Sequence, residues 1–112
     1  MKIYHNSRCS KSRETLALIK EAGVEPEIIE YLKEVPDKNT LKDILVKLNM
    51  KPTEILRKGE KIYKEKFKDM NLSEDEWIQI MVENPRLIER PIVVKGNKAI
   101  IGRPPENVKK LL

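Results

Sequence analysis

The sequence predicts an α/β fold in which a mixed sheet is built from two halves, with a helical insertion between them. Three observations support this prediction: a strand–helix–strand pattern opens the chain, amphipathic helical patterns fill its middle, and a hairpin with a following helix closes it. The length of 112 residues fits one domain. We therefore expect residues 1–112 to form a single domain.

The first half is a strand–helix–strand unit. Residues 2–5, KIYH, predict a short strand, and residues 10–23 predict a helix with an apolar stripe and with Gly23 as its C-terminal stop. Residues 25–32, EPEIIEYL, are rich in β-branched and aromatic side chains and predict a second strand. Because these elements follow one another within about 30 residues, they favour a right-handed parallel βαβ unit.

The insertion is predicted to be helical. Four apolar residues recur at the i, i+3, i+4, i+7 spacing of one helix face; they are Leu41, Ile44, Leu45 and Leu48. Pro52 should open a short helical piece that ends near Gly59. Residues 60–71 show no single pattern, although their apolar side chains could anchor an irregular helical segment.

A further helix of the insertion should begin after Ser73, which forms a capping box with Glu76. We expect this helix to end at Asn84-Pro85, because proline does not continue a helix. Three apolar side chains should be buried on it: Trp77, Ile80 and Met81.

The closing half is a hairpin followed by a helix. Residues 91–101, PIVVKGNKAII, hold two apolar runs around Gly96-Asn97, a two-residue hairpin turn. Residues 103–112, RPPENVKKLL, predict a helix with proline in its first turn. A βαβ unit joined to a hairpin and a final helix is the thioredoxin-like arrangement. The predicted fold is thus a thioredoxin-like mixed sheet with a helical insertion between the βαβ half and the ββα half.

Composition and charge narrow the classes of function. The net charge of +5 suits an anionic ligand, but the basic residues are interleaved with 18 acids, which disfavours nucleic-acid binding. The single cysteine excludes an internal disulfide framework and a four-thiolate metal site. The N-terminus lacks the apolar core of a signal peptide, and no apolar run approaches the roughly 18 residues of a membrane span. We expect a cytoplasmic protein with no bound metal, no membrane contact and no nucleic-acid partner.

The candidate chemistry lies in residues 5–16, HNSRCSKSRETL, which hold the only histidine and the only cysteine. Cys9 falls between the first strand and the first helix, at an edge where open α/β sheets bind ligands. The N–H groups and partial positive charge of a helix N-terminus can lower a thiol pKa from about 8.5 to roughly 3.5–7.5. Arg8, Lys11 and Arg13 should lower the pKa of Cys9 further. Alternatively, Cys9 is a small buried hydrophobic residue.

His5 and Ser12 are further candidates beside the thiol. His5 either tunes and orients the thiol or is a strand-end residue with an ordinary hydrogen bond. Ser12 stands one helical turn after Cys9 and can donate a hydrogen bond to the sulfur, or it is an ordinary serine of a first turn.

The segment YHNSRCSKSRETL, followed in order by EPEIIEYL, ILRKGEKIY, ENPRLIERPIVV and IGRPPE, resembles the glutaredoxin-type arsenate reductase family over essentially the whole chain. The resemblance implies a thioredoxin-like fold and the reduction of arsenate to arsenite, coupled to glutathione and glutaredoxin. It implies that Cys9 is the nucleophile, with His5 and Ser12 beside it, and that Pro91 matches the cis-proline of such folds. It also implies three arginines that bind the oxyanion: Arg57, Arg90 and Arg103.

These implied roles agree with elementary chemistry. A thiolate approaches an anion such as arsenate only if cations offset the repulsion, and guanidinium groups bind tetrahedral oxyanions through two-pronged hydrogen bonds. Arg90 and Arg103 flank the predicted hairpin, which could bring both to the same edge. Cys9 would attack arsenic, glutathione would attack the adduct, and a glutaredoxin would resolve the mixed species. With no second cysteine in the chain, glutathione acts as a co-substrate and no bound cofactor is expected.

Three other functions fit the same pattern. One is an Spx-type transcriptional regulator that binds the RNA polymerase alpha subunit, although Ser12 removes the C-x-x-C switch that many such regulators carry. Another is a thiol-disulfide transfer protein that uses the same site on disulfides. The last is a scaffold in which the site is vestigial.

Overall fold

The computed structural model describes all 112 residues, from Met1 to Leu112. They divide into two units, each of which is described by itself. The first unit contains Met1–Val35 and Arg90–Leu112, and the second contains Pro36–Glu89. The expectation of a single domain over residues 1–112 stays a prediction.

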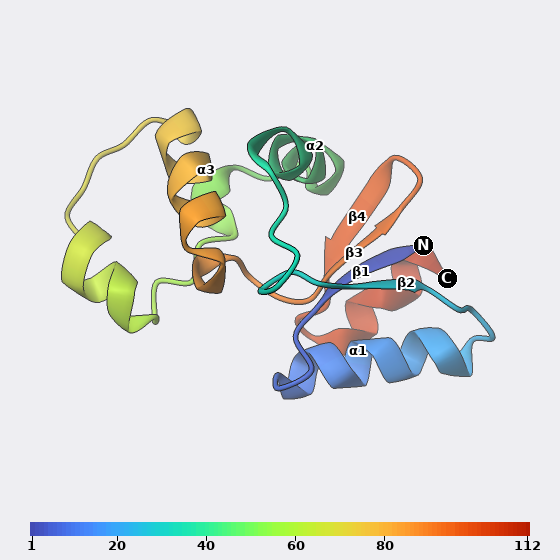
Figure 1. Ribbon diagram of the computed structural model, residues 1–112. Coiled ribbons are helices and arrows are strands. Elements are labelled where there is room, and N and C mark those ends of the chain that lie inside the picture. The colour runs from blue at the N-terminus through green and yellow to red at the C-terminus, as the bar shows by residue number, and fades with distance from the viewer. The chain divides into compact units, whose positions relative to one another are not determined.

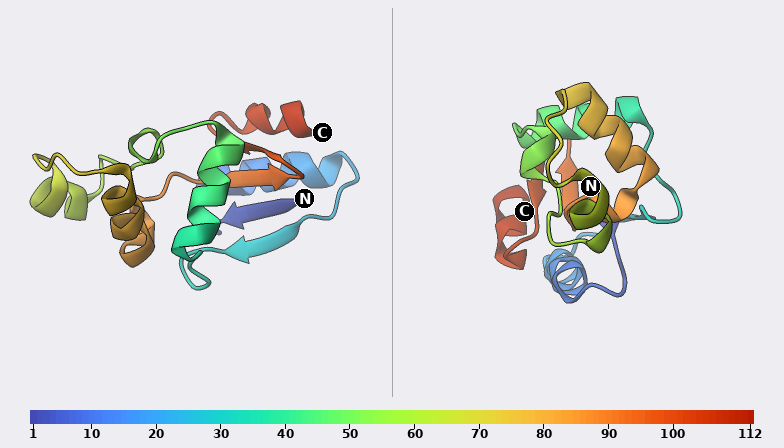
Figure 2. Two further views of the ribbon diagram at one scale, coloured as in Figure 1. Left: turned by 90° about the horizontal axis from the view of Figure 1, so that it is seen from above. Right: turned by 90° about the vertical axis from the view of Figure 1, so that its left-hand side faces the viewer.

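A four-stranded mixed sheet with the order β2-β1-β3-β4 forms the centre of the first unit. Its strands are β1 (Lys2–His5), β2 (Glu27–Glu30), β3 (Ile92–Lys95) and β4 (Lys98–Ile101). β1 is parallel to β2 and antiparallel to β3, and β3 is antiparallel to β4. The left view of Figure 2 shows the arrows of β1 and β2 pointing the same way. The predicted mixed sheet and its four strands are confirmed.

Two helices pack on one face of this sheet (Figure 1). They are α1 (Ser10–Glu21) and η4 (Pro105–Leu111), and the latter is a 3₁₀-helix rather than an α-helix. The core between helices and sheet consists of Ile3, Ile19, Val93, Val108 and Leu111. Burying each of these side chains stabilises the fold by about 1.5–3 kcal/mol. The predicted βαβ and ββα halves therefore share one apolar core.

The turn between β3 and β4 contains the two residues that the sequence predicts. Lys95 pairs with Lys98, and Gly96 between them has φ +60°, which glycine adopts without the strain of a side chain. Glycine with positive φ at the first central position matches a type II′ turn, whose twist suits a hairpin. The register Ile92↔Ile101 then places the residues before β3 beside those after β4.

The second unit is helical, with α2 (Lys38–Leu48) and α3 (Glu74–Glu83) as its α-helices. Asp37 caps α2 by accepting the Thr40 N–H at 2.7 Å. Ser73 and Glu76 form the predicted capping box of α3, with bonds of 3.2 and 3.1 Å. The four residues of the predicted apolar face of α2 are all buried: Leu41, Ile44, Leu45 and Leu48.

Several details of the second unit differ from the sequence prediction. The helical piece at Pro52 is a single 3₁₀ turn, η1 (Pro52–Glu54), which ends before Gly59. A π-helical turn, η2 (Tyr63–Phe67), lies in the segment without a clear pattern, and a second 3₁₀ turn, η3 (Pro85–Leu87), follows α3. The ring centroids of Tyr63 and Phe67 each lie 6.4 Å from that of Trp77, so this irregular helix packs its aromatic side chains against α3.

The buried face of α3 is rotated slightly from the predicted one. Trp77 and Met81 are buried as expected, but Ile78 replaces Ile80, which is only half-buried. Residues at i, i+1 and i+4 share a face as well as those at i, i+3 and i+4, so the sequence pattern alone allowed both. No helix of the chain has the length and apolar character that crossing a membrane requires.

Candidate active site around Cys9

Cys9 lies where β1 gives way to α1, at the carboxyl end of a strand. It is the N-cap residue of α1, with extended backbone angles of φ −95° and ψ 123°. Its N–H donates to the Asn6 carbonyl at 3.0 Å, and its own carbonyl accepts the Arg13 N–H at 3.0 Å. The thiol is 8% exposed, so it is shielded from bulk solvent but not sealed in the core.

The pKa of the Cys9 thiol lies below its ordinary value. Burial raises this pKa, but the backbone N–H of Ser12, the guanidinium of Arg90 and the backbone N–H of Lys11 together lower it further. Neither N–H forms a hydrogen bond of standard geometry with the sulfur, so their effect is that of a helix N-terminus facing the thiolate. The site therefore favours a thiolate nucleophile.

The cations beside the thiol come from the other half of the unit and not from its sequence neighbours. We expected Arg8, Lys11 and Arg13 to lower the pKa of Cys9, but the structure assigns this effect to Arg90, from the other half of the unit. Arg13 instead donates its Nη1 to the Ser7 carbonyl at 2.9 Å, and Arg8 is exposed. Lys11 lowers the pKa of Cys9 through its backbone N–H.

Arg90 and Arg103 converge on the sulfur, as the flanking positions of the hairpin suggested. Arg103 Nη2 lies 3.5 Å from Cys9 Sγ, and Arg103 Nε donates to the Arg90 carbonyl at 2.8 Å. Burial lowers the pKa of Arg90, but its contacts with the Cys9 sulfur and with Tyr31 raise it to a greater extent. The buried Nε of Arg90 has no hydrogen-bond acceptor within the protein, which leaves a donor for a bound oxyanion.

His5 and Ser12 form a buried pair behind the thiol. The Ser12 hydroxyl lies 2.6 Å from His5 Nδ1 and accepts the Asn6 N–H at 3.0 Å. Burial lowers the pKa of His5, with Glu30 opposing this effect and Arg13 and Lys20 adding to it. His5 is therefore neutral near pH 7, and the Ser12 hydroxyl can donate to its Nδ1.

The sequence left two alternatives for Ser12: a donor to the sulfur or an ordinary serine of a first turn. In the structure its hydroxyl pairs with His5 Nδ1 and accepts the Asn6 N–H. Its backbone N–H is the group that faces the sulfur. This pairing gives the buried Nδ1 of His5 a hydrogen-bond partner, and leaving such a group without one would cost free energy. Catalytic roles for His5 and Ser12 stay predictions.

Arg57 belongs to the second unit, where it is held by two carboxylates. Its Nη1 lies 2.8 Å from Glu89 Oε1, and its Nε lies 3.6 Å from Glu60 Oε2. Its backbone N–H also donates to the Leu87 carbonyl at 2.7 Å, beside the isolated bridge between Leu56 and Ile88. The predicted binding of an oxyanion by Arg57 stays a prediction.

The peptide bonds before Pro91 and Pro104 are both cis. The first is the one that the resemblance implied, and the second was not foreseen. The Pro91 carbonyl accepts the Gly102 N–H at 2.9 Å, which ties the two ends of the hairpin together beside Arg90 and Arg103.

Two features of the site were missed from the sequence. Tyr31 is 1% exposed and interacts with the Arg90 guanidinium. Gly102 packs so tightly that an added Cβ would lie 2.8 Å from Pro91 Cγ and closer still to Thr15 Oγ1. The sequence offered one signal for each residue. Tyr31 is an aromatic residue with a hydroxyl group directly after a predicted strand, and Gly102 directly precedes the candidate residue Arg103.

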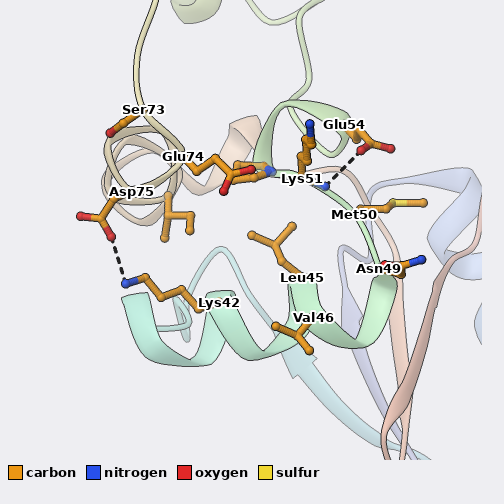
Figure 3. Close-up of a pocket in the computed structure, with 12 residues that line it drawn as sticks. Lys42, Leu45, Val46, Asn49, Met50, Lys51, Glu54, Ser73, Glu74 and Asp75 are labelled. Carbon is orange, nitrogen blue, oxygen red and sulfur yellow. Dashed lines mark hydrogen bonds and ion pairs between the residues drawn. The ribbon is translucent and has the colours of Figure 1, made fainter.

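A cavity of about 890 Å³ lies elsewhere, in the second unit, between the end of α2 and the start of α3 (Figure 3). None of the predicted site residues lines it. Its charged lining contains Lys42, Lys51, Glu54, Glu74 and Asp75, and Lys42 is already paired with Asp75 at 2.9 Å. This excess of acids would repel an oxyanion. No three His, Cys, Asp or Glu side chains are grouped so that they could hold a metal ion.

The arrangement around Cys9 can perform nucleophilic attack on an anionic electrophile. The thiol is favoured as thiolate, two guanidinium groups lie beside it, and the α1 N-terminus adds a partial positive charge. These cations offset the repulsion that an anion would otherwise meet.

Comparisons with known proteins identify similar sequences and structures. The sequence model of the ArsC family matches residues 4–111. The chain is 55% identical to "Uncharacterized protein YfgD" of Escherichia coli strain K12, covering 100% of this chain and 96% of that protein. It is 42% identical to an arsenate reductase of Neisseria meningitidis, covering 100% and 97%. The solved structure of an arsenate reductase from Vibrio cholerae superposes with a TM-score of 0.95 and 45% identity, covering 99% and 96%.

Proposed function

The chain belongs to the ArsC family, and from this premise we propose that it reduces arsenate to arsenite through the thiolate of Cys9. Glutathione and a glutaredoxin supply the electrons in this proposal. The observation that carries it is the convergence of Arg90 and Arg103 on a thiol whose pKa is lowered at a helix N-terminus. Few reactions other than attack on an anionic centre need that combination.

The chemistry begins with the Cys9 sulfur. The thiolate attacks arsenic(V), and an arsenate oxygen leaves as water after taking up protons, so that a sulfur–arsenic bond replaces an oxygen–arsenic bond. Arg90 and Arg103 hold the remaining oxygens and offset their charge. His5 and Ser12 orient the loop that carries the nucleophile, because the Ser12 hydroxyl joins the end of β1 to the first turn of α1.

The electrons come from outside the chain. Cys9 is its only cysteine, so no internal disulfide can form. A glutathione thiol displaces a second water at arsenic, and a glutaredoxin thiolate then attacks the glutathione sulfur. That step forms a mixed disulfide and leaves an electron pair on arsenic, which becomes arsenic(III). Hydrolysis of its bond to Cys9 releases arsenite. Glutathione is abundant in the cytoplasm, which is therefore the proposed location.

Arg57 is proposed as a third oxyanion-binding residue. Its two carboxylate partners, Glu60 and Glu89, compete with an oxyanion for its donors. A role for Arg57 thus requires that arsenate replace at least one of these contacts when it binds.

A coupled assay tests the proposal. The purified chain is mixed with glutathione, glutaredoxin, glutathione reductase and NADPH, and oxidation of NADPH is followed after arsenate is added. We expect turnover that depends on arsenate and that is absent in Cys9→Ser. No turnover with arsenate, together with reduction of a small disulfide, would instead assign the site to thiol-disulfide transfer. Capture of the RNA polymerase alpha subunit by a chain that is inactive on both substrates would support the regulator.

A further inference from the structure

We propose that the contact between Thr15 and Gly102 sets the distance between the Cys9 sulfur and the two arginines beside it, which makes these two residues positioning residues. Thr15 lies on α1, the helix that Cys9 caps, and its side chain is fully buried. Gly102 is buried as well and directly precedes Arg103. The contact therefore joins the helix behind the nucleophile to the segment that carries an arginine.

Gly102 supplies space at this contact rather than an unusual backbone conformation. It is not among the glycines with positive φ, but a Cβ at this position would lie 2.8 Å from Pro91 Cγ, 3.0 Å from Thr15 Cγ2 and closer still to Thr15 Oγ1. Carbon atoms in favourable contact lie about 3.5–4.0 Å apart. The missing side chain thus lets α1 approach Pro91, which directly follows Arg90, as well as the backbone before Arg103.

The Thr15 side chain is held from its own helix. Its hydroxyl donates to the Lys11 carbonyl at 2.8 Å and lies 3.4 Å from the Gly102 carbonyl. A hydroxyl has one proton, so turning it away from a new group at position 102 would break the shorter of these two bonds. A group inserted at the contact therefore presses on α1 itself.

The backbone around Gly102 is held on the other side of the contact. The Gly102 N–H donates to the Pro91 carbonyl at 2.9 Å. The side-chain amide of Asn107 donates to the carbonyls of both neighbours of Gly102, Ile101 and Arg103, at 3.1 Å each. Because three hydrogen bonds fix this short segment, it moves together with the hairpin and η4 rather than bending away from α1 alone.

Both ends of the contact lead to the site. Ser12 lies one turn before Thr15 on the buried face of α1, and its backbone N–H acts on the Cys9 sulfur. Arg103 follows Gly102, and its Nη2 lies 3.5 Å from the same sulfur. Electrostatic attraction weakens with distance, so a wider contact would reduce the stabilisation that the arginines give to the thiolate.

Gly102→Ala tests the proposal, because it inserts a methyl group into the contact. We expect the pKa of Cys9, titrated by the ultraviolet absorbance of its thiolate, to rise by about half a unit. An opposite charge within ~4–6 Å shifts a pKa by about 1–3 units, and here the arginines are moved away rather than deleted. Gly59→Ala is the matched control, since nothing lies within 4 Å of a Cβ there, and it should leave the Cys9 titration unchanged. An unchanged pKa in a folded Gly102→Ala protein would overturn the proposal.

A double-mutant cycle shows whether the methyl group acts through Thr15. Thr15→Ala removes both atoms that the new methyl group would meet on α1. In the double variant Gly102→Ala/Thr15→Ala, the pKa of Cys9 should therefore return toward its wild-type value. A rise as large as that of Gly102→Ala alone would overturn the proposal, because the methyl group would then act through Pro91 or through a general loosening of the fold.

Thr15→Val provides a second measurement if Gly102→Ala does not fold. A methyl group is bulkier than a hydroxyl and donates no hydrogen bond, so it should widen the same contact from the side of α1. The pKa of Cys9 should rise again, by less than in Gly102→Ala. An unchanged pKa in folded Thr15→Val would count against the proposal as decisively.

This inference rests on the proposed function, because it explains what sets the spacing between the nucleophile and two oxyanion-binding arginines. The titrations need no arsenate, however. If the wild-type chain does not reduce arsenate but the pKa of Cys9 still rises in Gly102→Ala, the proposed function fails and the positioning role stands. If arsenate is reduced and the pKa does not change, the reverse holds.

Discussion

Arg103 Nη2 lies 3.5 Å from the sulfur of Cys9, although 94 residues separate the two in the chain. The same guanidinium donates its Nε to the Arg90 carbonyl. One side chain thus touches the proposed nucleophile and the backbone of the second arginine at the same time.

This contact predicts a large effect of Arg103→Ala on arsenate reduction. Loss of a hydrogen bond to a charged group costs about 1.5–3 kcal/mol, which corresponds to a fall in kcat/KM of roughly 10- to 150-fold. Steady-state kinetics in the coupled assay measure it. Arg86→Ala is the matched control, because Arg86 is an exposed arginine of the second unit. Equal losses in both variants would show that only the overall charge of the protein matters.

The lowered pKa of Cys9 predicts fast alkylation at pH values where ordinary thiols are slow. The thiolate is the form that reacts with iodoacetamide. The pH at which the rate constant of Cys9 reaches half its maximum should therefore be lower than the corresponding pH for free glutathione in the same buffer. Cys9→Ser gives the blank, because the chain has no other thiol. A midpoint at or above that of glutathione would contradict a stabilised thiolate.

The lowered pKa of His5 predicts a loss of stability in mild acid. The unfolded chain takes up a proton near the ordinary histidine pKa of about 6.5, whereas the folded chain does so only at lower pH. Between these two values the unfolded state binds more protons, so the free energy of unfolding falls as the pH falls. Urea denaturation at several pH values from about 7.5 to about 5.5 measures this slope. His5→Gln should make the slope shallower, and an identical slope would remove His5 as its source.

The two carboxylates on Arg57 predict an unusual gain of affinity. If arsenate must replace Glu89 at the Arg57 guanidinium, then Glu89→Gln should lower KM for arsenate several-fold, because a neutral amide competes less well than a carboxylate. Arg57→Ala should raise KM, and Glu89→Gln should have no effect in that background. If neither substitution changes the KM for arsenate, the ion pair between Arg57 and Glu89 has only a structural role in the second unit.

Gly102 predicts a difference in stability between two glycine-to-alanine variants. The new methyl group of Gly102→Ala would press on Pro91 and Thr15, and overpacking of this kind costs about 1–3 kcal/mol. Gly59→Ala is the control, since nothing lies within 4 Å of a Cβ at that position. Chemical denaturation measures both, and equal stabilities would mean that the packing around Gly102 relaxes freely.

Local patterns predicted most of the secondary structure, because their causes are local. The capping box at Ser73, the four-residue face of α2 and the turn at Gly96 each depend on residues within one or two turns of chain. The choice between α-, 3₁₀- and π-helix was not predictable in this way. The π turn at Tyr63–Phe67 accompanies the packing of two rings on Trp77, which follows in sequence and belongs to another element.

The sequence predicted which residues form the candidate site better than it predicted the contacts between them. Cys9, Arg90 and Arg103 could be chosen from the sequence, and the hairpin explains why the two arginines meet. Sequence proximity misled for the cations beside the thiol, because Arg13 extends to the carbonyl of Ser7. Tyr31 could not be found from local pattern, since the guanidinium that it interacts with belongs to Arg90, in the other half of the unit.

The turn of the β3–β4 hairpin lies at the opposite end from the two arginines of the candidate site. Arg90 and Arg103 are at the base, where Ile92 pairs with Ile101, and the exposed turn at Gly96 is at the other end. A short peptide tag or a fluorescent label inserted at this turn would therefore be separated from the arginines by the four residue pairs of the hairpin, a length of roughly 13 Å. The hairpin thus offers a permissive attachment point from which the chemistry at Cys9 can be watched in the intact protein.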